Sequence, residues 1–231
     1  MGRGHSHAVG DVKALVFGDS GGIGTAIADA LRVRGSEVTG LSRRDGLELT
    51  NQQSVAAAAD ALGDQRFDLI FNATGALVID GRGPEKTIQS ADADAMAAQF
   101  ALNATGVAML LRYFSPLMRE NARAVFASLS ARVGSIGDNG FGGWIGYRAA
   151  KAAQNQIIRT ASIEIGRKQK HHIVVALHPG TVETALTRDY ADRYPTIAPE
   201  QSAKALLDVI DGLTPRDNGT FRDWKGNPVE W

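Results

Sequence analysis

The stretch Lys13-Ala-Leu-Val-Phe-Gly-Asp-Ser-Gly-Gly-Ile-Gly-Thr-Ala-Ile27 decides the fold, because an apolar run leads directly into closely spaced glycines. The run predicts a buried strand that turns straight into a helix. Glycine at Gly18, Gly22 and Gly24 allows left-handed backbone dihedrals and a close approach to the backbone. The free N–H groups and the positive dipole end of the helix start favour a diphosphate. The stretch therefore predicts a dinucleotide site, with a plain strand-to-helix turn as the alternative.

Strand-like and helix-like segments alternate along the rest of the chain. Further strands are expected at Glu37–Ser42, Leu47–Thr50, Phe67–Ala73, Ala124–Ser128, Ile173–Leu177 and Thr220–Trp224. Helices are expected at Thr25–Arg34, Ser54–Leu62, Asp92–Met118 with a break near Pro116, Tyr147–Lys168 and Pro199–Gly212. Apolar strands without strict alternation are typical of parallel sheets covered on both faces. The pattern predicts an α/β fold, a single-domain Rossmann-type doubly wound parallel sheet of about seven strands with helices on both faces.

Composition excludes several classes of protein. Lys plus Arg and Asp plus Glu are both 25, which removes the electrostatic argument for a nucleic-acid partner. The chain has no cysteine, and His5 and His7 have no third ligand nearby, so no metal site is predicted. No apolar run approaches the ~20 residues that span a bilayer, and the first residues lack a signal-peptide core, so we expect a cytoplasmic protein with no membrane partner. Residues 1–10 are expected to form a loose arm, and residues 11–231 a single dinucleotide-binding catalytic domain.

Tyr147 and Lys151 are the candidate chemical pair. They stand four residues apart at the start of a predicted helix, so both side chains project from one face. A phenol there could give a proton to a carbonyl oxygen. A lysine charge ~5 Å away, at an effective dielectric of ~20, would lower the phenol pKa by roughly 2 units. The alternative is a partly buried aromatic beside a solvated lysine.

The order of these motifs resembles the short-chain dehydrogenases/reductases, in the single-domain branch with a Gly-x-x-x-Gly-x-Gly fingerprint. The motifs that carry the resemblance are Gly18-Asp-Ser-Gly-Gly-Ile-Gly24, Asn72-Ala-Thr-Gly75, Asn103, Ser128-Leu-Ser130, Tyr147-Arg-Ala-Ala-Lys151 and Pro179-Gly-Thr-Val-Glu-Thr184. The Gly134-Ser-Ile-Gly-Asp-Asn139 stretch, Gly143-Trp144, the run that starts at His178 and the closing Asp223-Trp-Lys-Gly-Asn-Pro-Val-Glu-Trp231 resemble the C-factor subgroup. Phe17 and Thr74 depart from the family pattern, which commonly has threonine and alanine there.

The resemblance implies a role for each site residue. Tyr147 is the implied general acid/base, Lys151 lowers its pKa and holds the nicotinamide ribose, Ser130 polarises the substrate carbonyl, and Asn103 holds a water that links Lys151 to solvent. Ser130 is preferred over Ser128 and Ser135 because it falls just past the predicted strand end. The alternative for Asn103 is a helix-interior amide satisfied by its neighbours. The implied cofactor-binding residues are Gly18, Ser20, Gly22, Ile23, Gly24, Ser42, Arg43, Arg44, Glu48, Asn72, Ala73, Gly75, Tyr147, Lys151, Pro179, Val182 and Thr184.

The end of the second strand indicates the cofactor. An NAD enzyme usually places a carboxylate there, whereas this chain has Ser42-Arg43-Arg44. Guanidinium groups match the 2′-phosphate of NADP, and a carboxylate would repel it. NADP(H) is therefore the predicted cofactor and NAD(H) the alternative, since Asp45 could neutralise one arginine.

The leading hypothesis is an NADP(H)-dependent oxidoreductase that transfers a hydride between nicotinamide and a small carbonyl or alcohol substrate. The alternative is a non-enzymatic or signalling NAD(P)-binding protein of C-factor type. The resemblance also implies a homodimer or homotetramer, paired through the helices Asp92–Leu111 and Tyr147–Gly166.

Overall fold

A parallel sheet of six strands forms the centre of the protein, in the order β2-β1-β3-β4-β5-β6. The computed structural model describes residues 12–184 and 196–231, and the predicted arm lies outside them. The strands are β1 (Lys13–Phe17), β2 (Glu37–Leu41), β3 (Leu69–Asn72), β4 (Ala124–Leu129), β5 (His172–His178) and β6 (Phe221–Asp223). The helices are α1 (Gly22–Val33), α2 (Gln52–Asp60), α3 (Ala93–Phe100), α4 (Gly106–Phe114), α5 (Ile145–Lys168) and α6 (Pro199–Gly212).

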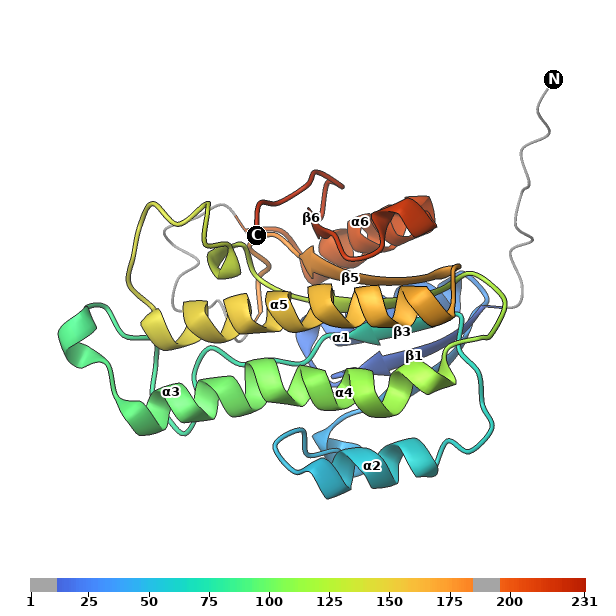
Figure 1. Cartoon of the computed structure of the whole chain (residues 1–231), viewed down its shortest axis with the longest axis horizontal. Helices are drawn as coiled ribbons and strands as arrows, with labels where there is room; N and C mark the ends of the chain where they lie inside the picture. Colours follow the sequence, from blue (N-terminus) through green and yellow to red (C-terminus); the bar gives the residue numbers. More distant parts are fainter. Residues whose placement is uncertain (1–11, 185–195) are drawn as a thin grey trace.

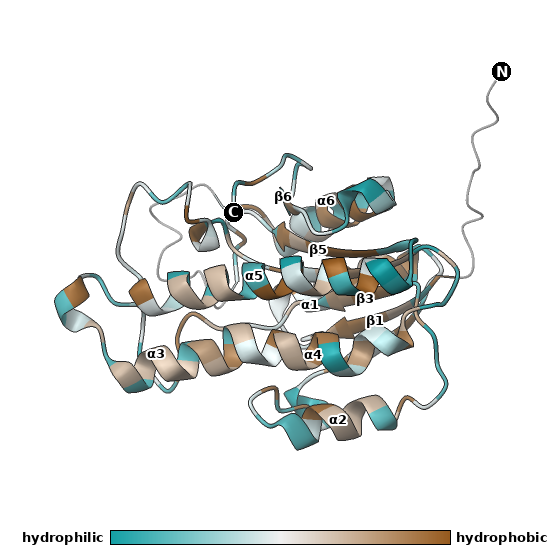
Figure 2. Ribbon diagram, in the orientation of Figure 1, coloured by the Kyte–Doolittle hydropathy of each residue, from teal (hydrophilic) through white to brown (hydrophobic). Residues whose placement is uncertain are grey.

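The four central strands, β1, β3, β4 and β5, are buried because helices cover both faces of the sheet (Figure 1). Along β1, Leu15 and Phe17 join the core beneath α2, α4 and α5, whereas Ala14 and Val16 join the core beneath α1 and α6. Alternate side chains of a strand point to opposite faces, so an unbroken apolar run supplies both cores. Figure 2 shows the resulting concentration of hydrophobic residues along the central strands.

The sheet topology places the ends of several strands at one edge. β1 pairs with β2 on one side and β3 on the other, so the winding direction reverses beside β1. In doubly wound folds, ligands bind outside the carboxyl ends of the strands at such a reversal. Phe17, Asn72, Leu129 and His178 end β1, β3, β4 and β5 at this edge.

The predicted strand Leu47–Thr50 is wrong, and the described part of the chain has six strands rather than about seven. Only residues 42–46 separate β2 from Leu47, whereas a parallel neighbour needs a crossover of about a dozen residues. A short 3-10 turn, Arg43–Asp45, fills this interval. Leu47 and Leu49 are nevertheless buried, because the loop packs both side chains into the core beneath α2 and α4.

The predicted helix Asp92–Met118 is interrupted twice. It ends near Pro116, as expected, in a 3-10 turn over Ser115–Leu117. A π-helical turn over Ala101–Thr105, which the sequence did not predict, lies between α3 and α4. Such turns recur at functional sites because they reorient one side chain within a helix. Among the described residues, no helix has the length and apolar character to cross a membrane.

Candidate functional site

The loop between β1 and α1 is a backbone cradle. Gly18 has φ +76°, and its N–H donates to the Leu41 carbonyl at 2.8 Å. A Cβ on Gly24 would lie 2.1 Å from the Gly18 carbonyl oxygen, so this position requires glycine. Gly21 caps α1 without a side chain, and the first turn carries no acidic residue. The loop therefore presents backbone N–H groups and a positive dipole end, the chemistry that a diphosphate needs.

Asp19 in this loop was not singled out from the sequence. Its Oδ1 is buried and has no hydrogen-bond partner among the described residues. A Cβ on Gly40 would lie 2.0 Å from Oδ2, so Gly40 leaves the room that the carboxylate occupies. A buried acceptor without a donor fits a hydroxyl supplied by a bound ligand, such as one of a nucleotide ribose. The residues of this loop thus fit a dinucleotide.

The end of β2 leaves its arginines exposed. Asp45 Oδ2 accepts hydrogen bonds from the Ser42 N–H at 2.9 Å and the Ser42 hydroxyl at 2.8 Å. Asp45 is thereby engaged by Ser42, and no salt bridge to Arg43 or Arg44 is found in the described part of the chain. Both arginines remain available for a phosphate.

Glu48 has a local role in the structure. Its Oε1 accepts from the Thr50 hydroxyl at 2.8 Å and the Thr50 N–H at 3.1 Å. These hydrogen bonds, followed by the charge of Arg43, lower the pKa of Glu48. The carboxylate therefore stabilises its own turn, and its contact with the cofactor stays a prediction.

The Asn72 motif organises the end of β3. Asn72 Oδ1 accepts from the Thr74 N–H at 3.0 Å and the Thr74 hydroxyl at 2.6 Å, so the unusual threonine stabilises the turn. Phe17, the other departure, packs edge-on against Phe114 with 4.6 Å between ring centroids. Gly75 follows with φ +143°. Thr74 and Phe17, the two departures from the family pattern, therefore stabilise the structure locally.

Tyr147 and Lys151 lie together on α5 and are both buried, at 7% and 4% exposure. The Lys151 Nζ stands 5.9 Å from the Tyr147 ring centroid. Burial raises the pKa of Tyr147 above its ordinary value and lowers the pKa of Lys151 to about 7. The expected lowering of the tyrosine pKa is therefore absent in this state, because desolvation outweighs the neighbouring charge and weakens that charge itself.

Only Ser130 among the three candidate serines lies just past a strand end. Its Oγ donates to Asn155 Oδ1 at 2.6 Å. Ser128 lies within β4, fully buried, and its Oγ accepts from Asn72 Nδ2 at 2.9 Å. Ser135 Oγ accepts from the Asp138 N–H at 3.1 Å. The structure thus bears out the positional reason for preferring Ser130.

Asn103 lies in the π-helical turn and faces the same region as Lys151. A Cβ on Gly75 would lie 2.9 Å from Asn103 Oδ1 and 3.5 Å from Lys151 Nζ. Asn103 Nδ2 donates to the Ala76 carbonyl at 2.9 Å and to Gln99 Oε1 at 2.7 Å. Asn103 Oδ1 also accepts from the Ala76 N–H at 3.1 Å, so the amide is satisfied by its neighbours, as the alternative for Asn103 expected. The absence of a side chain at Gly75 lets the Asn103 amide and Lys151 Nζ approach the same point of the backbone.

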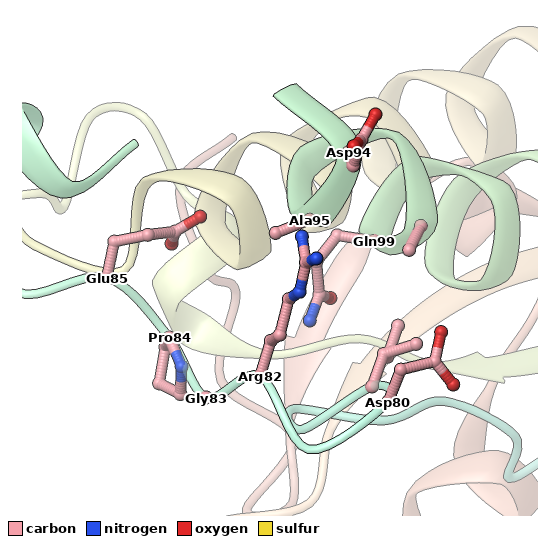
Figure 3. A pocket seen from close by; sticks show the side chains of 10 residues that line it. Asp80, Arg82, Gly83, Pro84, Glu85, Asp94, Ala95 and Gln99 are labelled. Atoms are coloured by element: carbon pink, nitrogen blue, oxygen red, sulfur yellow. The ribbon is translucent and has the colours of Figure 1, made fainter. Parts of the chain in front are cut away.

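A cavity of about 210 Å³ lies between the loop 79–85 and α3 (Figure 3). Gln99 lines it from α3 and accepts the hydrogen bond from Asn103. Glu85 lines it from the loop, and its Oε2 accepts from the Gly146 N–H at 3.1 Å, one residue before Tyr147. The cavity is thus lined by two side chains that hydrogen-bond to the predicted catalytic residue Asn103 and to the backbone next to Tyr147.

The polar residues that support the site were not predicted from the sequence. Gln154 and Asn155 follow Lys151 by three and four positions, so helical spacing alone could have placed them on its face. Gln99 precedes Asn103 by four positions in the same way. Glu85 lies far from Gly146 in sequence, and no local pattern connects the two.

Comparisons with known proteins agree with this architecture. A family profile described as enoyl-(acyl carrier protein) reductase matches residues 46–212. The chain is 32% identical over 232 residues to 1-hydroxy-2-glutathionyl-2-methyl-3-butene dehydrogenase of Rhodococcus sp. (strain AD45), covering 94% of this chain and 98% of that protein. It is 35% identical over 136 residues to the C-signal of Myxococcus xanthus, covering 59% of this chain and 78% of that protein. An NADPH-bound carbonyl reductase from chicken fatty liver has a similar fold, with a TM-score of 0.82, 24% identity and coverage of 96% of this chain and 100% of that chain.

Proposed function

Because the chain belongs to the short-chain dehydrogenase/reductase family, whose members are oxidoreductases, we propose that it is an NADP(H)-dependent enzyme that interconverts a carbonyl and an alcohol. The observation that carries this proposal is the buried Tyr147–Lys151 pair on one face of α5. Ser130 lies beyond the end of β4, and Asn103 and Lys151 both approach Gly75. A protein that only binds a dinucleotide has no need of a buried proton donor.

The cofactor would be held at the reversal of the sheet. The loop from Gly18 to Gly24 would bind the diphosphate, and Arg43 and Arg44 the 2′-phosphate. Lys151 would hold the nicotinamide ribose. NADP(H), when bound, would supply or accept the hydride. NAD(H) remains the alternative cofactor, and the exposed arginines favour NADP(H) because Ser42 engages the one adjacent carboxylate.

The proton chemistry would rest on Tyr147. Burial raises its pKa, which keeps the phenol protonated at neutral pH but makes it a weaker acid, so the charges of Lys151 and of a bound oxidised cofactor would have to lower that pKa for proton transfer. The Tyr147 hydroxyl would give its proton to the carbonyl oxygen, and the Ser130 hydroxyl would orient that oxygen. Reprotonation of the phenol would run through Lys151 and a water held by Asn103, since both side chains approach the backbone at Gly75.

The substrate mouth and the assembly are further parts of this proposal. Trp144 packs against Tyr147 with 6.3 Å between ring centroids and would form an apolar wall for the substrate. α4 and α5 lie side by side on the outside of the sheet (Figure 1). We expect the segments Asp92–Leu111 and Tyr147–Gly166 to pair with a second copy in a cytoplasmic homodimer or homotetramer.

A signalling or sensing role is the second candidate, supported by the similarity to the C-signal of Myxococcus xanthus. In that case the dinucleotide would stabilise the fold without turnover. The two candidates differ in whether Tyr147 is needed for anything beyond packing.

A panel of carbonyl compounds, assayed by NADPH oxidation, tests the proposal. The panel should include alcohols in the reverse direction, among them 1-hydroxy-2-glutathionyl-2-methyl-3-butene, because the Rhodococcus relative is named for that compound. Turnover of any member that depends on Tyr147 supports the enzyme. NADPH binding without turnover of any member would favour the signalling candidate.

A further inference from the structure

Gln154 is a fully buried amide on α5 that the proposed chemistry does not use. Its Oε1 accepts a hydrogen bond from Lys151 Nζ at 2.8 Å. Its Nε2 donates to the Leu129 carbonyl at 2.9 Å and to Ser128 Oγ at 3.1 Å. Ser128 in turn accepts from Asn72. One side chain therefore connects the lysine of the catalytic pair with the Asn72 motif at the end of β3.

The orientation of this amide follows from its partners. An ammonium only donates hydrogen bonds, and a carbonyl oxygen only accepts them. A rotated Gln154 amide would place its NH₂ group against Lys151 Nζ and its oxygen against the Leu129 carbonyl, losing both bonds. The oxygen of Gln154 must therefore face the ammonium.

Lys151 has few other groups to stabilise its charge. Besides Gln154, its Nζ donates to the Leu129 carbonyl at 3.2 Å. Tyr147 is the titratable side chain that faces it from α5. β4 contributes that carbonyl, the loop at Gly75 contributes backbone, and the π-helical turn contributes the Asn103 amide.

The remaining neighbour of Lys151 is the 3-10 turn Arg132–Gly134. A Cβ on Gly134 would lie 2.8 Å from Lys151 Cβ, so the turn packs directly against the lysine stem. Arg132, the charged residue of this turn, forms a salt bridge with Asp138. Among the described residues, therefore, neutral acceptors alone offset the burial of the ammonium.

We propose that Gln154 is a positioning residue that holds the Lys151 ammonium at the cofactor edge of the sheet and stabilises its charge. The proposal rests on the proposed function, in which Lys151 tunes Tyr147 and binds the ribose. A glutamine suits this role because its neutral oxygen supports the charge without forming an ion pair that would fix the proton on Lys151. Its two donated bonds hold it in place while the lysine exchanges protons.

The test follows the protonation of Lys151 directly. The NMR chemical shift of Lys151 Cε is followed as a function of pH in cofactor-free protein that carries isotopically labelled lysine. The Lys151 resonance is assigned as the one that disappears in Lys151→Arg. Gln154→Met removes the acceptor at similar length and should lower the titration midpoint by about one pH unit, the equivalent of a hydrogen bond to a charged group. Gln154→Glu should raise the midpoint by a similar amount or more.

Gln156 provides the matched control, because it lies two positions away on the same helix and is exposed. Gln156→Met and Gln156→Glu should leave the midpoint unchanged. If Gln154→Met does not fold, the nearly isosteric Gln154→Glu decides the question. Midpoints in both folded Gln154 variants within about a third of a pH unit of the parent value would overturn the proposal.

Turnover adds a second readout that separates the two proposals. The alkaline limb of the reduction pH profile should shift in the same direction as the Lys151 midpoint in each variant. The titration requires no substrate, so a midpoint shift without turnover supports the role of Gln154 and counts only against the enzyme. Normal turnover with an unshifted midpoint counts only against Gln154.

Discussion

The dinucleotide loop uses backbone atoms from one continuous stretch, whereas the Tyr147 site uses side chains from segments far apart in the chain. In the loop, Gly18 and Gly24 approach each other so closely that no side chain fits. At the Tyr147 site, Asn103, Ser130 and Lys151 depend on buried amide partners from their own or neighbouring elements. Changes in the loop should therefore act on cofactor affinity and folding, and changes at Tyr147 and Ser130 mainly on turnover.

Tyr147→Phe should produce the largest effect. Removing only the hydroxyl should lower turnover by ~10²–10⁴ and leave NADPH affinity nearly unchanged, because the proposed role is proton donation. Turnover is measured beside NADPH binding by fluorescence. Tyr113→Phe, at a hydroxyl that bonds Gln52 near the surface, is the control. A Tyr147→Phe enzyme with more than about a tenth of the parent rate would exclude the tyrosine mechanism.

Gly24→Ala should reduce stability and cofactor affinity, unlike Tyr147→Phe, which should reduce turnover. The added methyl would stand 2.1 Å from a backbone oxygen that cannot move without breaking the loop. We expect a loss of about 3 kcal/mol in the free energy of unfolding and a clear loss of NADPH binding. Gly35→Ala is the control, because it measures how much stability is lost when a glycine outside the loop is replaced by alanine. A Cβ at Gly35 meets no atom within 4 Å, although its φ of +86° adds strain. Similar losses of NADPH affinity in both variants would contradict a special role for the loop.

Arg43→Ala should weaken NADPH binding by about 1.5–3 kcal/mol and NADH binding far less, because only NADPH carries the 2′-phosphate. The comparison uses fluorescence titrations of both cofactors. Arg167→Ala, at an exposed residue near the far end of α5, should change neither. Equal losses for the two cofactors in Arg43→Ala would remove the argument for NADP selectivity.

Ser130→Ala should give a smaller loss of turnover than Tyr147→Phe and leave cofactor affinity unchanged, because the serine orients the carbonyl and donates no proton to it in the proposal. The pH optimum should also stay in place. Steady-state kinetics on any substrate from the panel measure this. A loss as large as that of Tyr147→Phe would give the serine a more direct part in the reaction.

Lys151→Met should have the smallest effect, a gain in the free energy of unfolding whose size depends on pH. Burial lowers the Lys151 pKa from 10.5 to about 7, so the unfolded chain binds the proton more tightly than the folded chain. The parent protein is therefore penalised below about pH 7, and the penalty fades as pH rises toward 10.5. We expect the variant to gain about 1 kcal/mol in the free energy of unfolding at pH 6, after the loss of two hydrogen bonds, and less at pH 9. Denaturant unfolding at both pH values checks this, and a gain that grows with pH would contradict it.

Much of the fold was predictable because its signals are local. The run Lys13–Phe17 and the glycines that follow predicted β1, its turn and α1, and the bounds of α6 were predicted without error. The strand at Leu47–Thr50 was not formed, although its leucines are buried as expected. Its apolar character was read correctly, but the connection to β2 is too short for a parallel crossover. Burial alone does not distinguish a strand from a packed loop.

The sequence by itself determined the parallel sheet, the glycine loop and the shared helix face of Tyr147 and Lys151, because each follows from spacing along a few turns or one strand. Only the tertiary structure decided the π-helical turn that carries Asn103, the unpartnered Asp19 oxygen beside Gly40 and the Gln154 bridge between Lys151 and Ser128. It also decided the direction of both pKa shifts, since desolvation depends on everything that packs around a group. Spacing defines which residues can share a face, whereas burial and hydrogen-bond partners come from segments that meet only when the chain folds.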